Sequence, residues 1–337
     1  MSAVASPRWF PQRYDAASDS VLLVERSEAD FRAAAFLDER SLVPHAPSYV
    51  VPWDTVAGAV PPDARRDIQY LFHIGHVGST LISRLLGELP QVLALREPQI
   101  LRDFTACLAE GFWEPASIPA RLDVLTSLLS RTFRPEQRTM AKATSFVSEI
   151  AADLIPAGSR ALLLYASPEH YVGNILGGPN SRQEMAATAA GRLERLHRRT
   201  GESRWSLAGL SEGETIAMAW ACEMSSLVQA GQRLGEERVM WLDFDAFLAE
   251  PAAGLGRLAH FFGLDVAAAE SLAGHPLMGR YSKAPEYEYD SALREEVLAE
   301  ARREHGGAIA DGLRWLRRAA GESEAVARCL DAAEAAG

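Results

Sequence analysis

The sequence predicts an α/β fold with a central parallel sheet flanked by helices, and three observations support this. Residues 71–86, LFHIGHVGSTLISRLL, read as an apolar strand, a glycine-containing turn and a helix with apolar spacing. Residues 160–165 contain a continuous apolar run, typical of a strand buried on both faces of a parallel sheet. A second apolar run, at residues 239–242, leads into another helical pattern. The 337 residues are enough to bury a large core within one α/β domain.

Residues 1–66 differ in pattern from the rest of the chain. We expect them to form an N-terminal extension packed on a main domain of residues 67–337, which carries helical insertions. Five prolines fall between residues 41 and 63, which indicates a linker. Because apolar side chains such as Trp53 interrupt it, we expect this linker to lie against the main domain. A lid over a ligand pocket is the functional alternative.

The remaining elements follow from local patterns. Ser27 and Asp30 form an S-x-x-D start for a helix that reaches Phe36, after a short strand at residues 20–25. Apolar spacing indicates helices across residues 100–132. We also expect a strand at residues 92–95 and helices at residues 146–154 and 255–262.

The turn at residues 75–80 carries the strongest functional signal. Two glycines, Gly75 and Gly78, allow the backbone to curl tightly and to point its N–H groups inward. The helix that follows adds unpaired N–H groups and the positive end of its dipole. Packing alone can place glycine at such a turn, but the neighbouring hydroxyls and imidazole favour a phosphate or sulfate site. We expect the anion to be bound by Gly75, His76, Val77, Gly78, Ser79, Thr80 and Leu81.

Residues 76–86, HVGSTLISRLL, lack the lysine that the ATP-binding pattern G-x-x-x-x-G-K-[ST] requires after Gly78. They resemble the 5′-phosphosulfate loop of sulfotransferases, R-S-G-[ST]-T-L-L-x-R-L-L, and in particular the bacterial and tyrosylprotein sulfotransferases. The resemblance implies a P-loop-like sulfotransferase fold and an enzyme that uses 3′-phosphoadenosine 5′-phosphosulfate as donor. Its acceptor would be a hydroxyl or amine of a small molecule or peptide. No metal is expected, because sulfuryl transfer needs none.

The resemblance also nominates catalytic residues. Glu97 follows the strand at residues 92–95, and a glutamate at this distance is the general base in the bacterial and tyrosylprotein enzymes. Residues 140–144 resemble the family's K-x-[TS] element, whose lysine, here Lys142, contacts the bridging region of the donor. We therefore expect Glu97 to deprotonate the acceptor. Lys142 and His76 would stabilise charge on the leaving phosphate.

The resemblance also covers residues 239–264, a strand followed by a helix that ends at Gly263. It does not cover the loop that binds the 3′-phosphate in the family. The family pattern R-[DN]-P-x-x-x-x-x-S, anchored on Pro168, places Ala166 at the arginine and Asn174 at the serine. Arginine forms charge-assisted bonds to phosphate, and alanine forms none. A neutral His76 weakens the other end of the donor site. We expect Asn174 to stay near the donor and other cations to compensate, the candidates being Arg182, Arg280 and Lys283; a loop with ordinary solvated charges is the alternative for the last two.

Two other functions stay open. A P-loop phosphotransferase or nucleotide-binding protein with another donor is favoured by Ala166 and Asn174, and Asp243 at a strand end would be its magnesium ligand. A catalytically silent ligand-binding module is the third possibility. Affinity for adenosine 3′,5′-bisphosphate, for 5′-AMP and for ATP with magnesium distinguishes the three.

Composition restricts the partners further. The 34 basic and 45 acidic residues give a net charge of −11, which disfavours nucleic acid and anionic membranes. No run of about 18 apolar residues and no targeting segment occurs, so we expect a cytoplasmic protein. Cys107, Cys222 and Cys329 lack the spacing of a disulfide framework or zinc site, so we expect core or helix-face thiols. No pattern indicates the oligomeric state.

One helical segment is strongly basic. Because charge runs usually face water, we expect a solvated helix face here rather than an anion site. The histidines have no Asp or Glu at a spacing typical of a metal site or catalytic triad. The arginines of the basic segment are Arg192, Arg195, Arg198 and Arg199.

Overall fold

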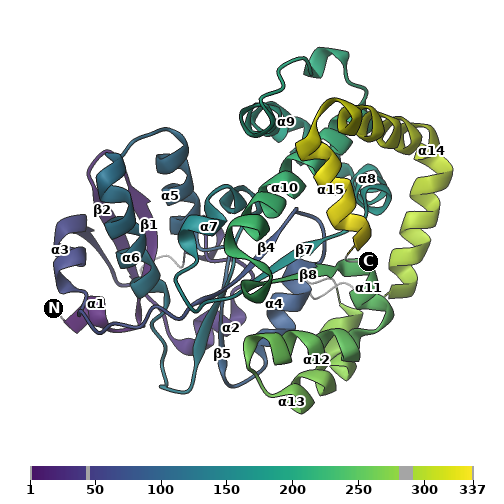
Figure 1. The fold of residues 1–337 in the computed structure, drawn as a ribbon. Helices are drawn as coiled ribbons and strands as arrows, with labels where there is room; N and C mark the ends of the chain where they lie inside the picture. The colour runs from purple at the N-terminus through teal and green to yellow at the C-terminus, as the bar shows by residue number, and fades with distance from the viewer. Residues whose placement is uncertain (1, 43–45, 281–290, 336–337) are drawn as a thin grey trace.

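The computed structural model describes residues 2–42, 46–280 and 291–335, and it confirms the predicted fold class. A five-stranded parallel sheet in the order β5-β6-β4-β7-β8 forms the centre, and helices flank it (Figure 1). Helix α4 packs on β4, β5 and β6, while α10 packs on β4 and β7. The strands are β4 (Gln69–His73), β5 (Val92–Arg96), β6 (Arg138–Lys142), β7 (Ala161–Tyr165) and β8 (Val239–Asp243).

The apolar runs form the predicted strands because both of their faces are covered. Every residue of β4, β5 and β7 is buried, as a central parallel sheet requires. Strand β4 occupies the middle of the sheet and leads directly into the glycine turn. Since the carboxyl ends of parallel strands share one edge, the residues that follow the five strands gather there.

The predicted helices are present. Residues 100–132 form α5 (Gln99–Ala109) and α6 (Ile118–Leu129), separated by the short 3₁₀ turn η2 (Pro115–Ser117). Residues 146–154 begin as a 3₁₀ helix, η3 (Ser145–Ile150), and continue as α7 (Ala151–Leu154). The other helices of the main domain are α4 (Ser79–Gly87), α8 (Pro168–Leu176), α9 (Pro179–Thr200), α10 (Glu212–Leu234), α11 (Phe244–Ala249), α12 (Pro251–Phe262), α13 (Val266–Ser271), α14 (Ser291–Glu322) and α15 (Glu324–Ala335), with 3₁₀ turns η4 (Leu207–Gly209), η5 (Glu236–Arg238), η6 (Leu272–Gly274) and η7 (Pro276–Gly279).

A second, antiparallel sheet begins the chain and consists of β1 (Trp9–Asp15), β2 (Ser20–Glu25) and β3 (Ser48–Pro52). The predicted strand at residues 20–25 is confirmed. The predicted linker at residues 41–63 is wrong, because β3 pairs with β2 and α3 (Trp53–Ala59) follows it. The prolines, Pro52 among them, made strand β3 look like a linker in the sequence. Proline is tolerated here because Pro52 ends β3, and β3 is an edge strand.

Helix α2 (Glu28–Ala33) starts with the predicted capping box of Ser27 and Asp30, but it ends before Phe36. Two backbone bonds then fasten the segment to the main domain: Leu37 N–H donates to Arg96 O at 2.6 Å, and Gln99 N–H donates to Leu37 O at 3.1 Å. This attachment places the following turn, η1 (Glu39–Ser41), beside the carboxyl end of β5. A short helix α1 (Ser2–Ala5) precedes the antiparallel sheet.

Within the described residues, no helix is both long enough and apolar enough to cross a bilayer. Cys107, Cys222 and Cys329 are buried free thiols, as predicted.

Candidate active site

A cavity of about 570 Å³ opens at the carboxyl edge of the parallel sheet. Its floor is the turn that joins β4 to α4, and all seven residues from Gly75 to Leu81 line it. Its walls come from the residues that follow β5, β6 and β8, from one face of α9 as far as Arg192, from the first turns of α14, and from the η1 turn. The cavity therefore lies where the sheet topology gathers the strand ends.

The turn is held in a tight, partly left-handed conformation. Gly75, His76 and Gly78 have φ values of +83°, +53° and +66°. A Cβ on Gly78 would lie 1.9 Å from Phe244 Cζ, so only glycine fits there. No side chain caps the start of α4, and Asn174 Nδ2 donates to His76 O at 2.9 Å. The first N–H groups of α4 thus face the cavity without a side-chain cap, as an anion site requires.

Glu97 and Lys142 meet beside this turn. Their strands pair in parallel with Arg96 opposite Lys142, so the residue after β5 reaches the end of β6. The side chain of Lys142 is 1% exposed, and its Nζ bonds to Glu97 Oε1 and donates to Thr80 Oγ1 at 3.1 Å. Glu97 has a φ of +53°, an uncommon backbone state for a residue with a side chain.

Glu97 has a second cationic neighbour that the sequence did not indicate. Arg40 Nη2 lies 3.6 Å from Glu97 Oε2, and the guanidinium carbon of Arg40 lies 3.6 Å from the ring centre of Phe36. Lys142 Nζ is 5.6 Å from the same ring centre. No local pattern links Arg40 to residues more than fifty positions away, so only the tertiary structure could reveal it.

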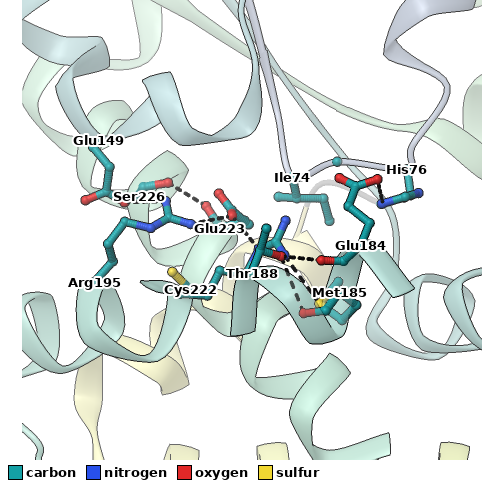
Figure 2. Close-up of polar contacts among 12 residues, drawn as sticks. Ile74, His76, Glu149, Glu184, Met185, Thr188, Arg195, Cys222, Glu223 and Ser226 are labelled. Carbon is teal, nitrogen blue, oxygen red and sulfur yellow. Dashed lines mark hydrogen bonds and ion pairs between the residues drawn. The ribbon is translucent and has the colours of Figure 1, made fainter. Parts of the chain in front are cut away.

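The ring of His76 lines the cavity but also faces α9. Its Nδ1 is 3.4 Å from Ser181 Oγ, and its Nε2 is 3.7 Å from Glu184 Oε2. Figure 2 shows His76 and Glu184 pointing toward each other.

The residues expected near a 3′-phosphate separate into two groups. Arg280 and Asn174 line the cavity, whereas Arg182 lies outside it in a surface ion pair with Glu212 at 2.7 Å. Lys283 lies outside the described residues. Ala166 is 2% exposed and does not line the cavity.

The structure adds a buried cation to this end of the cavity, Arg294 of α14. Its side chain is 7% exposed, lines the cavity and bonds to Asp245 Oδ1 at 2.8 Å. Its guanidinium carbon lies 5.0 Å from the ring centre of Phe244, the residue that packs against Gly78. His170 Nδ1 lies 2.7 Å from the other oxygen of Asp245. Burial alone would raise the pKa of Asp245, but the His170 and Arg294 contacts lower it overall.

The prediction of a solvated basic face on α9 is wrong for three of its four arginines. Arg192 and Arg195 bond to the buried Glu223 of α10 at 3.0 and 2.7 Å, and Arg199 bonds to Glu149. Figure 2 shows Arg195 directed at Glu223 and Glu149. Burial would raise the pKa of Glu223, but Arg195 and Arg192 lower it.

A sequence signal for this network existed. Arg192, Arg195 and Arg199 are spaced by three and four residues, so they share one helix face with Leu196. Glu223 interrupts an apolar run at residues 216–224 of α10. A buried carboxylate in an apolar helix requires a cationic partner. Arg198, the fourth arginine, is exposed as predicted.

Asp243, the candidate magnesium ligand, does not line the cavity. Its Oδ1 accepts the backbone N–H groups of Asp245 and Ala246, at 2.7 and 3.0 Å, and caps α11. Over residues 2–42, 46–280 and 291–335, no three or more His, Cys, Asp or Glu side chains are grouped to hold a metal ion.

No protein-family model and no curated protein matches this sequence. Among solved structures, the chain is similar to a sulfotransferase domain from the curacin biosynthetic pathway, with 12% identity, a TM-score of 0.43, and coverage of 72% of this chain and 98% of that one. It is also similar to the sulfotransferase STF9 from Mycobacterium avium, with 14% identity, a TM-score of 0.40, and coverage of 72% and 78%. A sulfotransferase from Alicyclobacillus acidocaldarius shows 15% identity, a TM-score of 0.37, and coverage of 75% and 99%. These likenesses are distant, and the function has to be argued from the site.

Proposed function

We propose that this protein is a sulfotransferase-like enzyme that moves a sulfuryl group from 3′-phosphoadenosine 5′-phosphosulfate to an acceptor hydroxyl or amine. One observation carries the proposal: Glu97, Lys142 and Thr80 meet beside an uncapped helix start in a single cavity. A base, a buried cation and an anion-binding turn are the three groups that such a transfer needs.

In this mechanism the turn at residues 75–81 binds the phosphosulfate through backbone N–H groups and the positive end of the α4 dipole. The acceptor oxygen forms a bond to sulfur as the bond from sulfur to the donor phosphate breaks. The acceptor proton passes to Glu97, and the leaving group is adenosine 3′,5′-bisphosphate. The atoms and charges balance without a further reactant.

Lys142 contacts both the anion-binding turn and the general base. Its Nζ lies between Thr80 on the turn and the carboxylate of Glu97. A donor anion in the turn competes for the ammonium group, which can then stabilise the leaving phosphate and release Glu97 to accept a proton. Donor binding therefore frees the carboxylate of Glu97 to act as the general base.

At the other end of the cavity, we assign the 3′-phosphate to Arg294 and Arg280. Arg294 is buried and held by Asp245, while Arg280 lines the cavity without an ion pair or side-chain hydrogen bond among the described residues. Together they replace the charge that the family pattern places at Ala166. Asn174 keeps the turn in position through His76 O.

A nucleotide-binding protein with a different donor is the second candidate, and the burial of Ala166 favours it. Calorimetry separates the candidates. The proposal expects tight binding of adenosine 3′,5′-bisphosphate and weaker binding of 5′-AMP, both independent of magnesium. Magnesium-dependent binding of ATP would support the second candidate, and binding of none of the three would indicate a silent fold. Transfer of labelled sulfate from the donor to an acceptor then tests the reaction itself.

A further inference from the structure

The wall of the cavity beyond Glu97 carries two arginines that the donor does not require. Arg40 comes from the η1 turn and Arg102 from α5, and both line the same cavity as Glu97. The donor end, with Asn174, Arg280 and Arg294, is built from other elements. The side with Arg40 and Arg102 is therefore available to a second ligand next to Glu97.

Arg40 is exposed but is held in place. Its Nε lies 3.0 and 2.9 Å from the two oxygens of Asp38, and its guanidinium stacks on Phe36. The Asp38 side chain is 8% exposed, and although burial would raise its pKa, the Arg40 bonds lower it overall. Arg40 Nη1 donates to none of the described residues. A long surface side chain fixed in this way loses little freedom when it binds a ligand.

Arg102 is the second arginine of this wall. It is exposed on the first turns of α5, and among the described residues it makes no hydrogen bond and no ion pair. The neighbouring charges are in direct contact with one another: Glu97 pairs with Lys142, and Asp38 pairs with Arg40. Glu184, another carboxylate of the wall, faces His76. Arg102 therefore has no direct ionic contact among the described residues and can offer its guanidinium to a ligand.

We propose that the acceptor is a small hydroxy compound that bears a carboxylate on an apolar or aromatic body. Arg102 and the free edge of Arg40 bind the carboxylate, Phe36 packs on the apolar body, and the hydroxyl faces Glu97. Arginine suits this role because its planar fork matches a carboxylate. The inference rests on the proposed function, since it names the substrate class of the same site.

The test compares three phenols that share the hydroxybenzyl body and differ in the terminal group: para-hydroxyphenylacetate with a carboxylate, its neutral amide, and tyramine with an ammonium group. Transfer rates and competitive binding to the protein saturated with adenosine 3′,5′-bisphosphate are measured for each. We expect the carboxylate to be preferred over the amide by about fivefold to tenfold, the range of one partly exposed charge-assisted bond. Arg102→Ala should remove most of this preference, and Arg102→Glu should shift it toward tyramine.

Arg257→Ala is the matched control, because Arg257 is also exposed and unpaired among the described residues but lies outside the cavity. It should leave the preference unchanged. Equal or greater preference for the amide or tyramine, binding of none of the three, or an Arg102→Ala variant that weakens all three equally would each overturn the inference. Adenosine 3′,5′-bisphosphate binding to the unmodified protein is measured separately, so failure of the proposed function is recognised by loss of that binding.

Discussion

The two ends of the cavity are assembled in different ways. At the centre, the turn follows β4, Glu97 follows β5 and Lys142 is the last residue of β6, so the topology brings them together. At the donor's far end, Arg294 comes from a helix that starts some 120 residues after β7. Site residues at the ends of parallel strands can therefore be predicted from the order of strands in the sequence. The position of a cation on a flanking helix cannot, because it depends on how that helix packs.

The largest effect should come from Glu97→Gln, which tests the strand-end group. The amide keeps the shape of the side chain but cannot accept the acceptor's proton, so the transfer rate should fall by about 10²–10⁴. Affinity for adenosine 3′,5′-bisphosphate, measured by calorimetry, should stay within a few-fold. A rate loss below about tenfold would move the role of base to another residue.

Gly78→Val tests the turn itself. The structure predicts loss of nucleotide binding by at least about 100-fold, because the new side chain meets Phe244 and the left-handed backbone resists a branched residue. Gly111→Val is the matched control: Gly111 has a φ of +63° but no atom within 4 Å of its Cβ position. Circular dichroism should show a folded main domain in both variants. Unchanged nucleotide affinity in Gly78→Val would refute the assignment of the turn.

Arg294→Ala tests the other end of the cavity, where we assign the 3′-phosphate. We expect affinity for adenosine 3′,5′-bisphosphate to fall about tenfold, the value of one charge-assisted bond, while affinity for 5′-AMP changes little. The 3′-phosphate assignment predicts this difference between the two ligands. If both affinities fall equally, Arg294 acts on the fold through Asp245 and not on the phosphate.

The smallest expected effect is a change of folding stability with pH. The hydrogen bond that His170 donates to Asp245 raises the pKa of His170 above its usual 6.5, against burial and the neighbouring Arg302 and Arg294. A raised folded-state pKa gives stability that is fully present below about pH 6.5 and is lost as the pH rises through the folded pKa. After allowance for solvent screening, we expect this His170 contact to contribute less than about 1 kcal/mol to the free energy of unfolding.

Thermal unfolding across this pH range measures the effect of His170. The pH-dependent part should disappear in His170→Gln and persist in His260→Gln, since His260 is exposed and has no ion pair with a carboxylate among the described residues. An identical pH profile for His170→Gln and the parent would show that the Asp245 contact does not stabilise the fold.

The basic helix α9 illustrates a partial failure of sequence reasoning. The spacing of Arg192, Arg195 and Arg199 is visible in the sequence, but whether that face meets water or a carboxylate is not. Glu223 lies about 30 residues further on and approaches only because α10 packs beside α9. A charge pattern therefore predicts a helix face, and tertiary packing decides what covers it.

By itself, the sequence determined the α/β class, the glycine turn and the positions of Glu97 and Lys142 at strand ends, because these depend on local apolar runs and on turn stereochemistry. Only the tertiary structure revealed β3, the approach of Arg40 to Glu97 and the burial of Arg294 beside Phe244. The physical reason is the same in each case: strand pairing and ion pairing join residues far apart in the chain, and no local pattern specifies such partners.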